Sequence, residues 1–153
     1  MISEITNPLL INRILELARI VPDTPIDKLK KMLIEGLTSK QAKIFIDEKN
    51  GEVRGFIFAT VEQMEGEDCV FIQFCVIKPI KEERYIGFEL LLKIRLWVKD
   101  LGLKYIYTMT PRSSKPFIRK YGFKFYTNVL RLRVNKEVVN EPDKKNISMA
   151  VPV

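Results

Sequence analysis

The fold of this chain is decided by three neighbouring stretches: Val76-Ile-Lys-Pro79, Arg84-Tyr-Ile-Gly-Phe-Glu89 and Leu90–Leu101. The apolar run that ends at Pro79 predicts a buried strand, and Leu90–Leu101 has the spacing of an apolar helix. We expect this helix to open at Gly87. The first turn of a helix carries free N–H groups and the positive end of the helix dipole. The order strand, loop and helix therefore predicts a site for an anion such as phosphate.

Composition restricts the class of protein. The 153 residues suit one domain, and 46% hydrophobic with 29% charged residues is typical of a soluble globular protein. The sequence contains no run near the roughly 18 apolar residues of a membrane span, and Met1-Ile-Ser-Glu-Ile5 does not have the pattern of a signal peptide. We therefore expect a cytoplasmic protein that does not enter the membrane.

Charge and histidine content restrict the chemistry. The chain has no histidine, which excludes Ser-His and Cys-His nucleophiles and most zinc sites, so we expect no metal. Its net charge of +7 favours an anionic partner, which could be nucleic acid, an acidic protein or a phosphate-rich cofactor.

The two cysteines, Cys69 and Cys75, fall in one expected strand. A spacing of six residues puts them about 20 Å apart on the same side of an extended strand, so they cannot form a disulfide with each other. We interpret them as buried free thiols in a reducing compartment.

Hydrophobic periodicity and turn residues predict the remaining elements. We expect one helix to end near Ile20 and a second to run from Thr24-Pro-Ile-Asp27 until Gly36 stops it. The other expected elements are strands at Lys43–Asp47, Val53–Gln63, Cys69–Ile77, Tyr105–Thr110, Lys124–Tyr126 and Val129–Val134, a turn at Asn50-Gly51, and a helix at Lys115–Tyr121. This order predicts an α+β domain over residues 1–134, in which helices flank a mixed, mostly antiparallel central sheet in three layers. Residues 135–153 are polar and are expected to form a tail or an edge appendage.

The same order resembles the GNAT-type N-acetyltransferase superfamily over roughly residues 2–134. Ile77-Lys78-Pro79 is similar to the family's Val-x-Pro-like strand end, and Arg84-Tyr-Ile-Gly-Phe-Glu89 is similar to its Gln/Arg-x-x-Gly-x-Gly/Ala loop. Further along, Ile118-Arg-Lys-Tyr-Gly122-Phe123 is similar to the family's Tyr-x-x-x-Gly-Phe segment.

The resemblance implies acetyl-CoA as cosubstrate. Backbone groups of Cys75, Val76 and Ile77 would bind the pantetheine arm as an added strand does. The diphosphate would lie on the loop and helix start, whose residues are Arg84, Tyr85, Ile86, Gly87, Phe88 and Glu89.

The chain also departs from the family pattern. Glu89 replaces the second loop glycine, and a carboxylate near a diphosphate costs binding unless it points away. The tyrosine that family members often use to protonate the leaving thiolate is Ile118 here, and a frequent asparagine falls near Pro111. Glu62, at the end of an expected strand, is the best-placed general base, and Tyr121 is a substitute acid.

Three functions follow from these observations. The first is an acetyl-CoA-dependent N-acetyltransferase that moves the acetyl group directly to a primary amine of a small molecule or protein. The second is a GNAT-like domain without catalysis that acts as a CoA-binding or regulatory module. The third is a basic nucleic-acid-associated protein, for which the basic residues are Lys115, Arg119, Lys120 and Lys124. The interleaved aromatic residues follow core periodicity, which argues against a nucleic-acid partner, and a homodimer remains open.

Overall fold

The computed structural model describes residues 1–109, 121–124 and 132. The chain divides into two compact units, Met1–Ser113 and Ser114–Val153, and each is described by itself. The expected helix at Lys115–Tyr121 is described only at its last residue, Tyr121, which is helical and is followed by Gly122 with a φ of 74°. Most of the expected strand at residues 124–126, the strand at 129–134 and the boundary between 134 and 135 lie outside the described residues.

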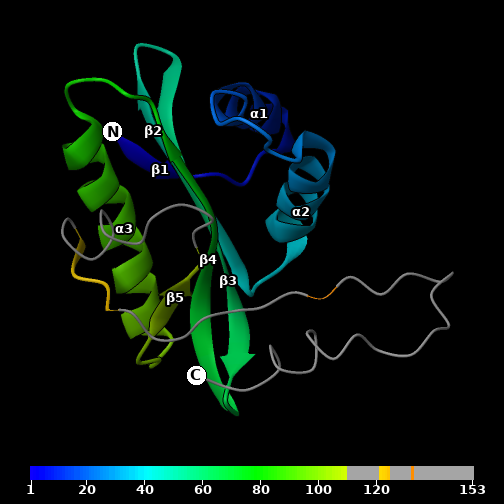
Figure 1. Ribbon diagram of the computed structural model, residues 1–153, viewed down its shortest axis with the longest axis vertical. Coiled ribbons are helices and arrows are strands. Elements are labelled where there is room, and N and C mark those ends of the chain that lie inside the picture. The colour runs from blue at the N-terminus through cyan, green and yellow to red at the C-terminus, as the bar shows by residue number, and fades with distance from the viewer. Residues whose placement is uncertain (110–120, 125–131, 133–153) are drawn as a thin grey trace, which may run out of the picture. The chain divides into compact units, whose positions relative to one another are not determined.

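A five-stranded sheet forms the centre of the first unit, in the order β1-β2-β3-β4-β5 (Figure 1). The strands are β1 (Ile2–Glu4), β2 (Ala42–Lys49), β3 (Glu52–Met64), β4 (Glu67–Ile77) and β5 (Ile106–Thr108). Neighbouring strands are antiparallel except β4 and β5, which are parallel. The expected mixed, mostly antiparallel sheet is therefore confirmed.

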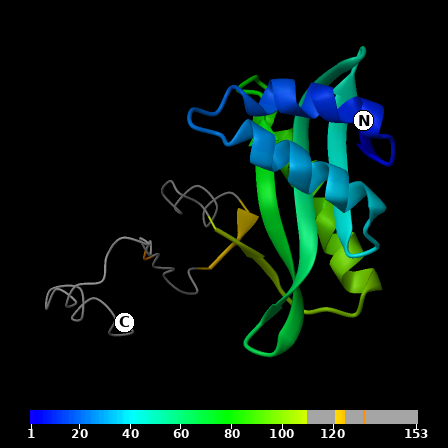
Figure 2. The same ribbon diagram turned by 90° about the vertical axis from the view of Figure 1, so that its right-hand side faces the viewer.

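Helices cover both faces of this sheet. The 3-10 turn η1 (Pro8–Leu10) leads into α1 (Ile11–Ala18), and α1 packs with α2 (Ile26–Thr38) on one face, whereas α3 (Glu83–Asp100) lies on the other (Figures 1 and 2). The three layers predicted from the sequence are confirmed, and α3 makes the crossover between the parallel strands β4 and β5. No helix in the described part of the chain is long and apolar enough to cross a bilayer.

The second helix does not stop at Gly36, as we expected, but continues to Thr38. A Cβ atom at Gly36 would lie 2.9 Å from Cε2 of Phe58, which is fully buried in the core. Glycine at this position lets the ring of Phe58 approach the helix backbone closely. Gly36 therefore serves helix–sheet packing, and the expectation that it ends the helix was wrong.

The third helix begins at Glu83, four residues before the expected start at Gly87. The N–H of Ile86 already donates an intrahelical hydrogen bond of 2.9 Å to the carbonyl of Glu82. Glu83 and Arg84 are good helix formers, and the acidic side chain of Glu83 in the first turn interacts favourably with the helix dipole. Gly87 is buried in the second turn of α3.

A β-bulge in β4 changes which face its residues occupy. Phe58 pairs with Phe74 but Ala59 pairs with Ile72, so Gln73 has no partner in β3. Such an extra residue reverses the alternation of side chains that follow it.

The bulge separates the two cysteines. Cys69 pairs with Glu62 and Cys75 with Ile57, and these two positions of β3 lie on opposite faces because five residues separate them. Both thiols are free; Cys69 is 1% exposed, whereas Cys75 is exposed on the face that carries α3. The expectation of two buried thiols on one side was therefore wrong for Cys75.

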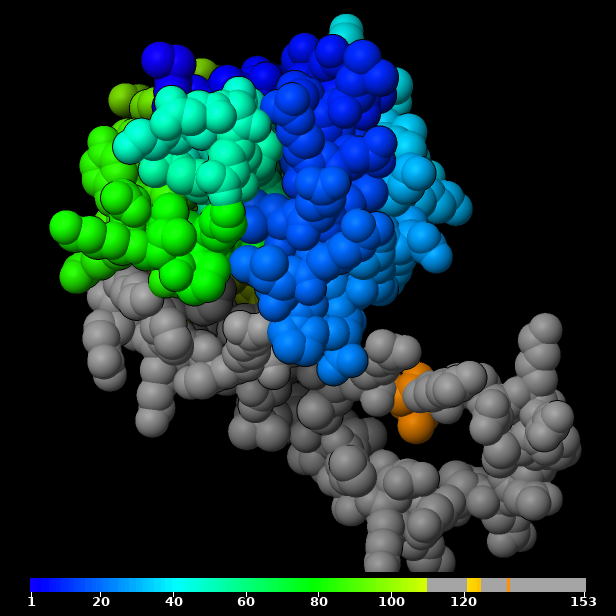
Figure 3. Space-filling model, turned by 90° about the horizontal axis from the view of Figure 1, so that it is seen from above, coloured from blue at the N-terminus to red at the C-terminus, as the bar shows by residue number. Residues whose placement is uncertain are grey.

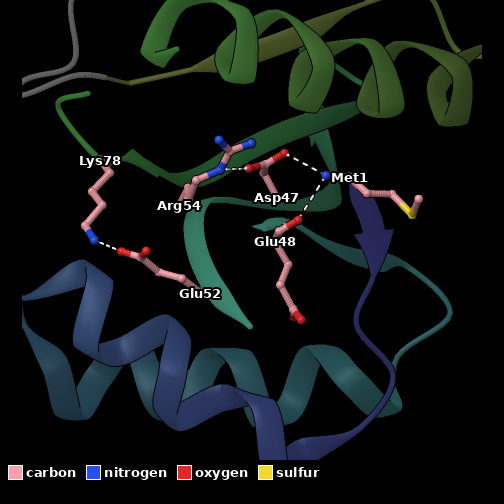
Figure 4. A network of polar contacts seen from close by, with 6 residues as sticks. All are labelled: Met1, Asp47, Glu48, Glu52, Arg54 and Lys78. Atoms are coloured by element: carbon pink, nitrogen blue, oxygen red, sulfur yellow. Dashed lines mark hydrogen bonds and ion pairs between the residues drawn. The ribbon is translucent and has the colours of Figure 1, made fainter. Parts of the chain in front are cut away.

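A second bulge, in β3, holds a buried ion pair. Arg54 has no partner in β2, and its Nε donates a 2.6 Å hydrogen bond to the Asp47 carboxylate, which is 5% exposed (Figure 4). The α-amino group of Met1 lies 3.3 Å from the other Asp47 oxygen. The hydrogen bond to Asp47, together with the nearby charges of Asp47 and Glu82, raises the pKa of Arg54 against the opposing effect of burial.

The same bulge ties down the loop that follows β4. The backbone N–H of Lys78 donates a 2.7 Å hydrogen bond to the carbonyl of Arg54. The ammonium group of Lys78 also pairs with the carboxylate of Glu52 (Figure 4). The start of the loop between β4 and α3 is thus fixed to β3 through backbone and side chain.

A substitution at Gly55 should test how α3 is seated on the sheet. A Cβ atom there would lie 2.9 Å from Cγ2 of Ile86 and 3.3 Å from Cδ1 of Leu90. We expect Gly55→Ala to lower the free energy of unfolding by about 1–3 kcal/mol through overpacking, as measured by urea denaturation. The matched control is the same substitution in an Ile86→Ala background, where the 2.9 Å contact to Cγ2 is gone and the cost of Gly55→Ala should fall. Full additivity of the two changes would contradict this packing.

Candidate functional site

The strands β4 and β5 pair over only three residues. Val70–Ile72 pairs with Ile106–Thr108, and β4 then continues to Ile77 without a strand partner on that side among the described residues. The bulge residue Gln73 stands where this pairing ends. Within residues 1–109, the last five residues of β4 therefore have one edge open to another extended segment.

Backbone direction decides which peptide groups face this open edge. The N–H of Lys78 points to β3, where it bonds the carbonyl of Arg54. Peptide groups alternate in direction along a strand, so the N–H and C=O groups of Val76 also point to β3. Those of Cys75 and Ile77 point away from β3, toward the open edge. Of the three β4 residues expected to bind a cofactor, the alternation thus favours Cys75 and Ile77.

The first turn of α3 follows directly after this edge. Its N-terminal residues Glu83, Arg84 and Tyr85 precede the first intrahelical N–H donor, Ile86, and Glu83 bonds instead to the carbonyl of Ile80. Arg84 and Tyr85 are exposed. Seen from above, the green segment that includes the β4–α3 loop and the start of α3 lies at the surface beside the teal β2–β3 turn (Figure 3). An anion at this end would meet the N–H groups of the first turn.

The Arg84–Glu89 segment, which was expected to hold the diphosphate, therefore contains both exposed and buried positions of α3. Ile86 and Gly87 are buried against the sheet, which leaves Arg84 and Tyr85 at the helix start. The guanidinium carbon of Arg84 lies 5.7 Å from the ring centroid of Phe88, which is 42% exposed. Glu89 is half-buried and falls in the second turn, not in the first.

Glu62 lies on the face of β3 that carries α1 and α2, because Phe58, four residues earlier in the strand, packs against Gly36 of α2. Its carboxylate accepts a 3.0 Å hydrogen bond from the hydroxyl of Thr60, and Thr60 in turn accepts a 3.0 Å hydrogen bond from the Gln73 side chain. Glu62 itself is exposed. Two hydrogen bonds therefore connect this carboxylate to the bulge in β4. Tyr121, the other candidate, is half-buried in the second unit.

Acidic residues gather in the β3–β4 hairpin although the chain carries a net charge of +7. Residues 55–77 contain no lysine or arginine, and their four acids are Glu62, Glu65, Glu67 and Asp68. This segment therefore favours a cation over an anion. In the part of the chain that the structure describes, no group of three or more acidic or cysteine side chains could hold a metal ion.

Aromatic side chains lie beside the same strands. Phe71 of β4 pairs in register with Tyr107 of β5, and the ring centroids of Tyr105 and Tyr107 are 6.1 Å apart. Strand alternation places these rings on the same face as Thr60 and Glu62. Aromatic faces next to a carboxylate are compatible with an organic cation such as an amine.

The two thiols differ in their surroundings. Desolvation raises the pKa of Cys75 to about 12, although part of its side chain is open to solvent. Burial raises the pKa of Cys69 as well, and the charges of Glu62 and Asp68 add to this effect. Both thiols are therefore protonated near neutral pH, which argues against either as a nucleophile.

Comparison with known proteins identifies the fold. No protein-family model matches the chain, and no curated protein sequence does. Solved structures match it well. The aminoglycoside 6'-N-acetyltransferase AAC(6')-IG from Acinetobacter haemolyticus is 14% identical, with a TM-score of 0.75 over 90% of this chain and 99% of that protein. The chain has the GNAT-type acetyltransferase fold.

Two further structures of the same GNAT fold contain ligands. AAC(6')-Iy, in complex with the bisubstrate analogue CoA-S-monomethyl-acetylneamine, is 20% identical, with a TM-score of 0.72 over 88% of this chain and 97% of that protein. A predicted acetyltransferase from Clostridium acetobutylicum, with acetyl-CoA, is 16% identical, with a TM-score of 0.71 over 87% and 96%.

The prediction from the sequence did not include two residues of this site, Thr60 and Gln73. Neither belongs to a motif, and their contact depends on the register between β3 and β4, which the apolar run from Cys69 to Ile77 does not reveal. Gln73, the only polar uncharged side chain in that run, was the one available signal.

The thiols offer a direct test of the bulge. We expect iodoacetamide to label Cys75 and to leave Cys69 unmodified in the native protein, as read by mass spectrometry. Because the pKa of Cys75 is about 12, its labelling rate should rise about tenfold per pH unit between about pH 8 and pH 10. Cys75→Ser is the control and should remove the label. Faster labelling of Cys69, or a plateau near pH 9, would contradict this arrangement.

Proposed function

We propose that the protein is an acetyl-CoA-dependent N-acetyltransferase that moves an acetyl group directly to a primary amine. The observation that carries the proposal is the open edge of β4, which ends at the exposed first turn of α3 in a GNAT-type fold. An extended amide-containing arm can bond to that edge, and a diphosphate suits a helix N-terminus. CoA combines these two chemical groups in one molecule.

The residues that would hold CoA lie on two elements. Cys75 and Ile77 would offer backbone N–H and C=O groups to the pantetheine amides. The N–H groups of Arg84 and Tyr85, with the Arg84 guanidinium, would meet the diphosphate. Acetyl-CoA would supply the acetyl group as a thioester, and the released thiolate would take up one proton.

Glu62 is the proposed general base. A primary amine is protonated near neutral pH and must lose a proton before it can act as a nucleophile. The carboxylate of Glu62 would accept that proton, directly or through water. The acidic hairpin and the rings of Phe71 and Tyr107 would favour a cationic acceptor on this face. Tyr121 is the proposed proton donor to the leaving group, and the notable departure is Ile118 at the family's tyrosine position.

Ile118 also supports a second candidate, a domain that binds CoA without transferring the acetyl group. The two proposals share the cofactor and differ in turnover. A panel of amines decides between them, and it should include aminoglycosides, because several proteins of this fold are aminoglycoside N-acetyltransferases. Acetyl transfer to any member excludes the second candidate.

Calorimetry with acetyl-CoA tests the cofactor proposal. We expect Arg84→Ala to weaken binding about tenfold, because it removes a charge-assisted contact to the diphosphate. Arg95→Ala, an exposed position three turns further along α3, is the matched control and should bind as the wild type does. Pantetheine lacks the diphosphate, so its affinity should not respond to Arg84→Ala. Absence of binding at millimolar acetyl-CoA would exclude both the enzyme and the CoA-binding module.

Acetyl transfer measured by release of free thiol tests the role of Glu62. We expect Glu62→Gln to lower kcat/KM by about 100-fold or more, the usual contribution of a general base. Glu65→Gln makes the same chemical change at an exposed position of the same hairpin, so it should raise the KM for the amine by about twofold and leave kcat unchanged. Equal effects of the two substitutions would show that only the charge of the hairpin matters.

A further inference from the structure

We infer that Thr60 and Gln73 are positioning residues that hold the Glu62 carboxylate against the bulge in β4. The inference rests on the proposed function, because Glu62 is the proposed base of that reaction. Neither Thr60 nor Gln73 has a counterpart in the sequence motifs.

The direction of the two hydrogen bonds is fixed by chemistry. An ionised carboxylate has no proton to donate, so the Thr60 hydroxyl must donate its single proton to Glu62. The group that faces the remaining lone pairs of Thr60 must then be a donor. The Gln73 Nε2 group fills this role at 3.0 Å. The order Gln73 to Thr60 to Glu62 therefore gives the Thr60 hydroxyl both a donor and an acceptor as partners.

The relay includes the bulge residue itself. Ile72 pairs with Ala59 on the face that carries α3, so the next side chain, Gln73, turns to the face that carries α1 and α2. Phe71 faces Thr60 directly in the register, and Gln73 lies two residues further along β4. From there its Nε2 group reaches the hydroxyl of Thr60.

A second observation places the Glu62 carboxylate close to β4. Glu62 pairs in register with Cys69, and its charge contributes to the raised pKa of that buried thiol. The carboxylate therefore lies close enough to β4 to act on Cys69. A free glutamate on an exposed strand would sample many rotamers, and the hydrogen bond from Thr60 restricts it.

The consequence is a fixed relation between the base and the open edge of β4. Gln73 stands where β4 and β5 part, which is where an arm bound along Cys75 and Ile77 would begin. A base held to within about 0.5 Å of a productive position is worth far more than a mobile one. The relay supplies this restraint from side chains that do not touch the proposed cofactor edge.

Variants of Thr60 separate positioning from folding. Thr60→Val keeps the shape of the side chain and removes the hydroxyl. We expect it to lower kcat about tenfold, the loss of one hydrogen bond to a charged group, and to leave the KM for acetyl-CoA within about twofold. Thr60→Ser retains the hydroxyl and should restore kcat to near the wild-type value. If Val and Ser variants lose kcat equally, or if neither loses it, the relay has no part in catalysis.

Gln73→Met tests the other end of the relay. It keeps the length of the side chain without its donor, and we expect a smaller loss of kcat, about threefold, because Thr60 still donates to Glu62. Gln63→Met, at an exposed position on the same hairpin, is the matched control and should leave kcat unchanged. A fall in kcat for the control as large as that for Gln73→Met would overturn the assignment.

One measurement does not depend on acetyl transfer. In NMR spectra, the side-chain amide of Gln73 should shift when Glu62 is replaced by Gln, and this response should disappear in a Thr60→Val background. A response that persists without the Thr60 hydroxyl would overturn the relay. If the response behaves as expected but no amine is acetylated, the relay stands as structure and the proposed function fails.

Discussion

The extra residue Gln73 in β4 is the constraint on which the candidate site depends. It reverses the side-chain alternation of β4 and stands where pairing with β5 stops. Because of this one residue, Cys75 faces α3 while Cys69 faces the opposite layer, and the peptide groups of Cys75 and Ile77 face the open edge. A regular strand of the same composition could continue its pairing with β5 and would leave no edge for a ligand.

The bulge at Arg54 in β3 fixes the other end of the same edge, opposite the Gln73 bulge in β4. Arg54 pairs with a carboxylate that is almost fully buried, and its carbonyl accepts the N–H of Lys78. A buried ion pair contributes little net stability compared with an apolar pair, but its loss leaves an unpaired charge, so it specifies one geometry. Here that geometry is the exit of the chain from β4 toward α3. The two bulges thus fix the two ends of the open edge.

The sequence predicts the layers well because they depend on periodicity, which is a local property of the chain. The hairpin turn at Asn50-Gly51 was predicted correctly for the same reason, since both residues adopt positive φ as this turn requires. The predicted helix ends at glycine were wrong where the glycine serves tertiary packing. Gly36 and Gly87 both lie inside helices, and Gly36 leaves room for the ring of Phe58. Bulges and the contacts they create depend on register between strands, which no local pattern encodes.

The early start of α3 changes the meaning of Glu89. A motif that opened the helix at Gly87 would place this carboxylate among the first-turn donors, where it would oppose a diphosphate. With the helix starting at Glu83, Glu89 lies more than one turn further along, over 5.4 Å by helix rise, and the cost to anion binding falls accordingly. Glu82 and Glu83 are the acids at the start of α3, and Arg84 follows them in the first turn. The charge of Arg54 also interacts with Glu82, but Arg54 is hydrogen-bonded to Asp47. The early helix start therefore removes Glu89 from the first turn and leaves Arg84 as the cation of that turn.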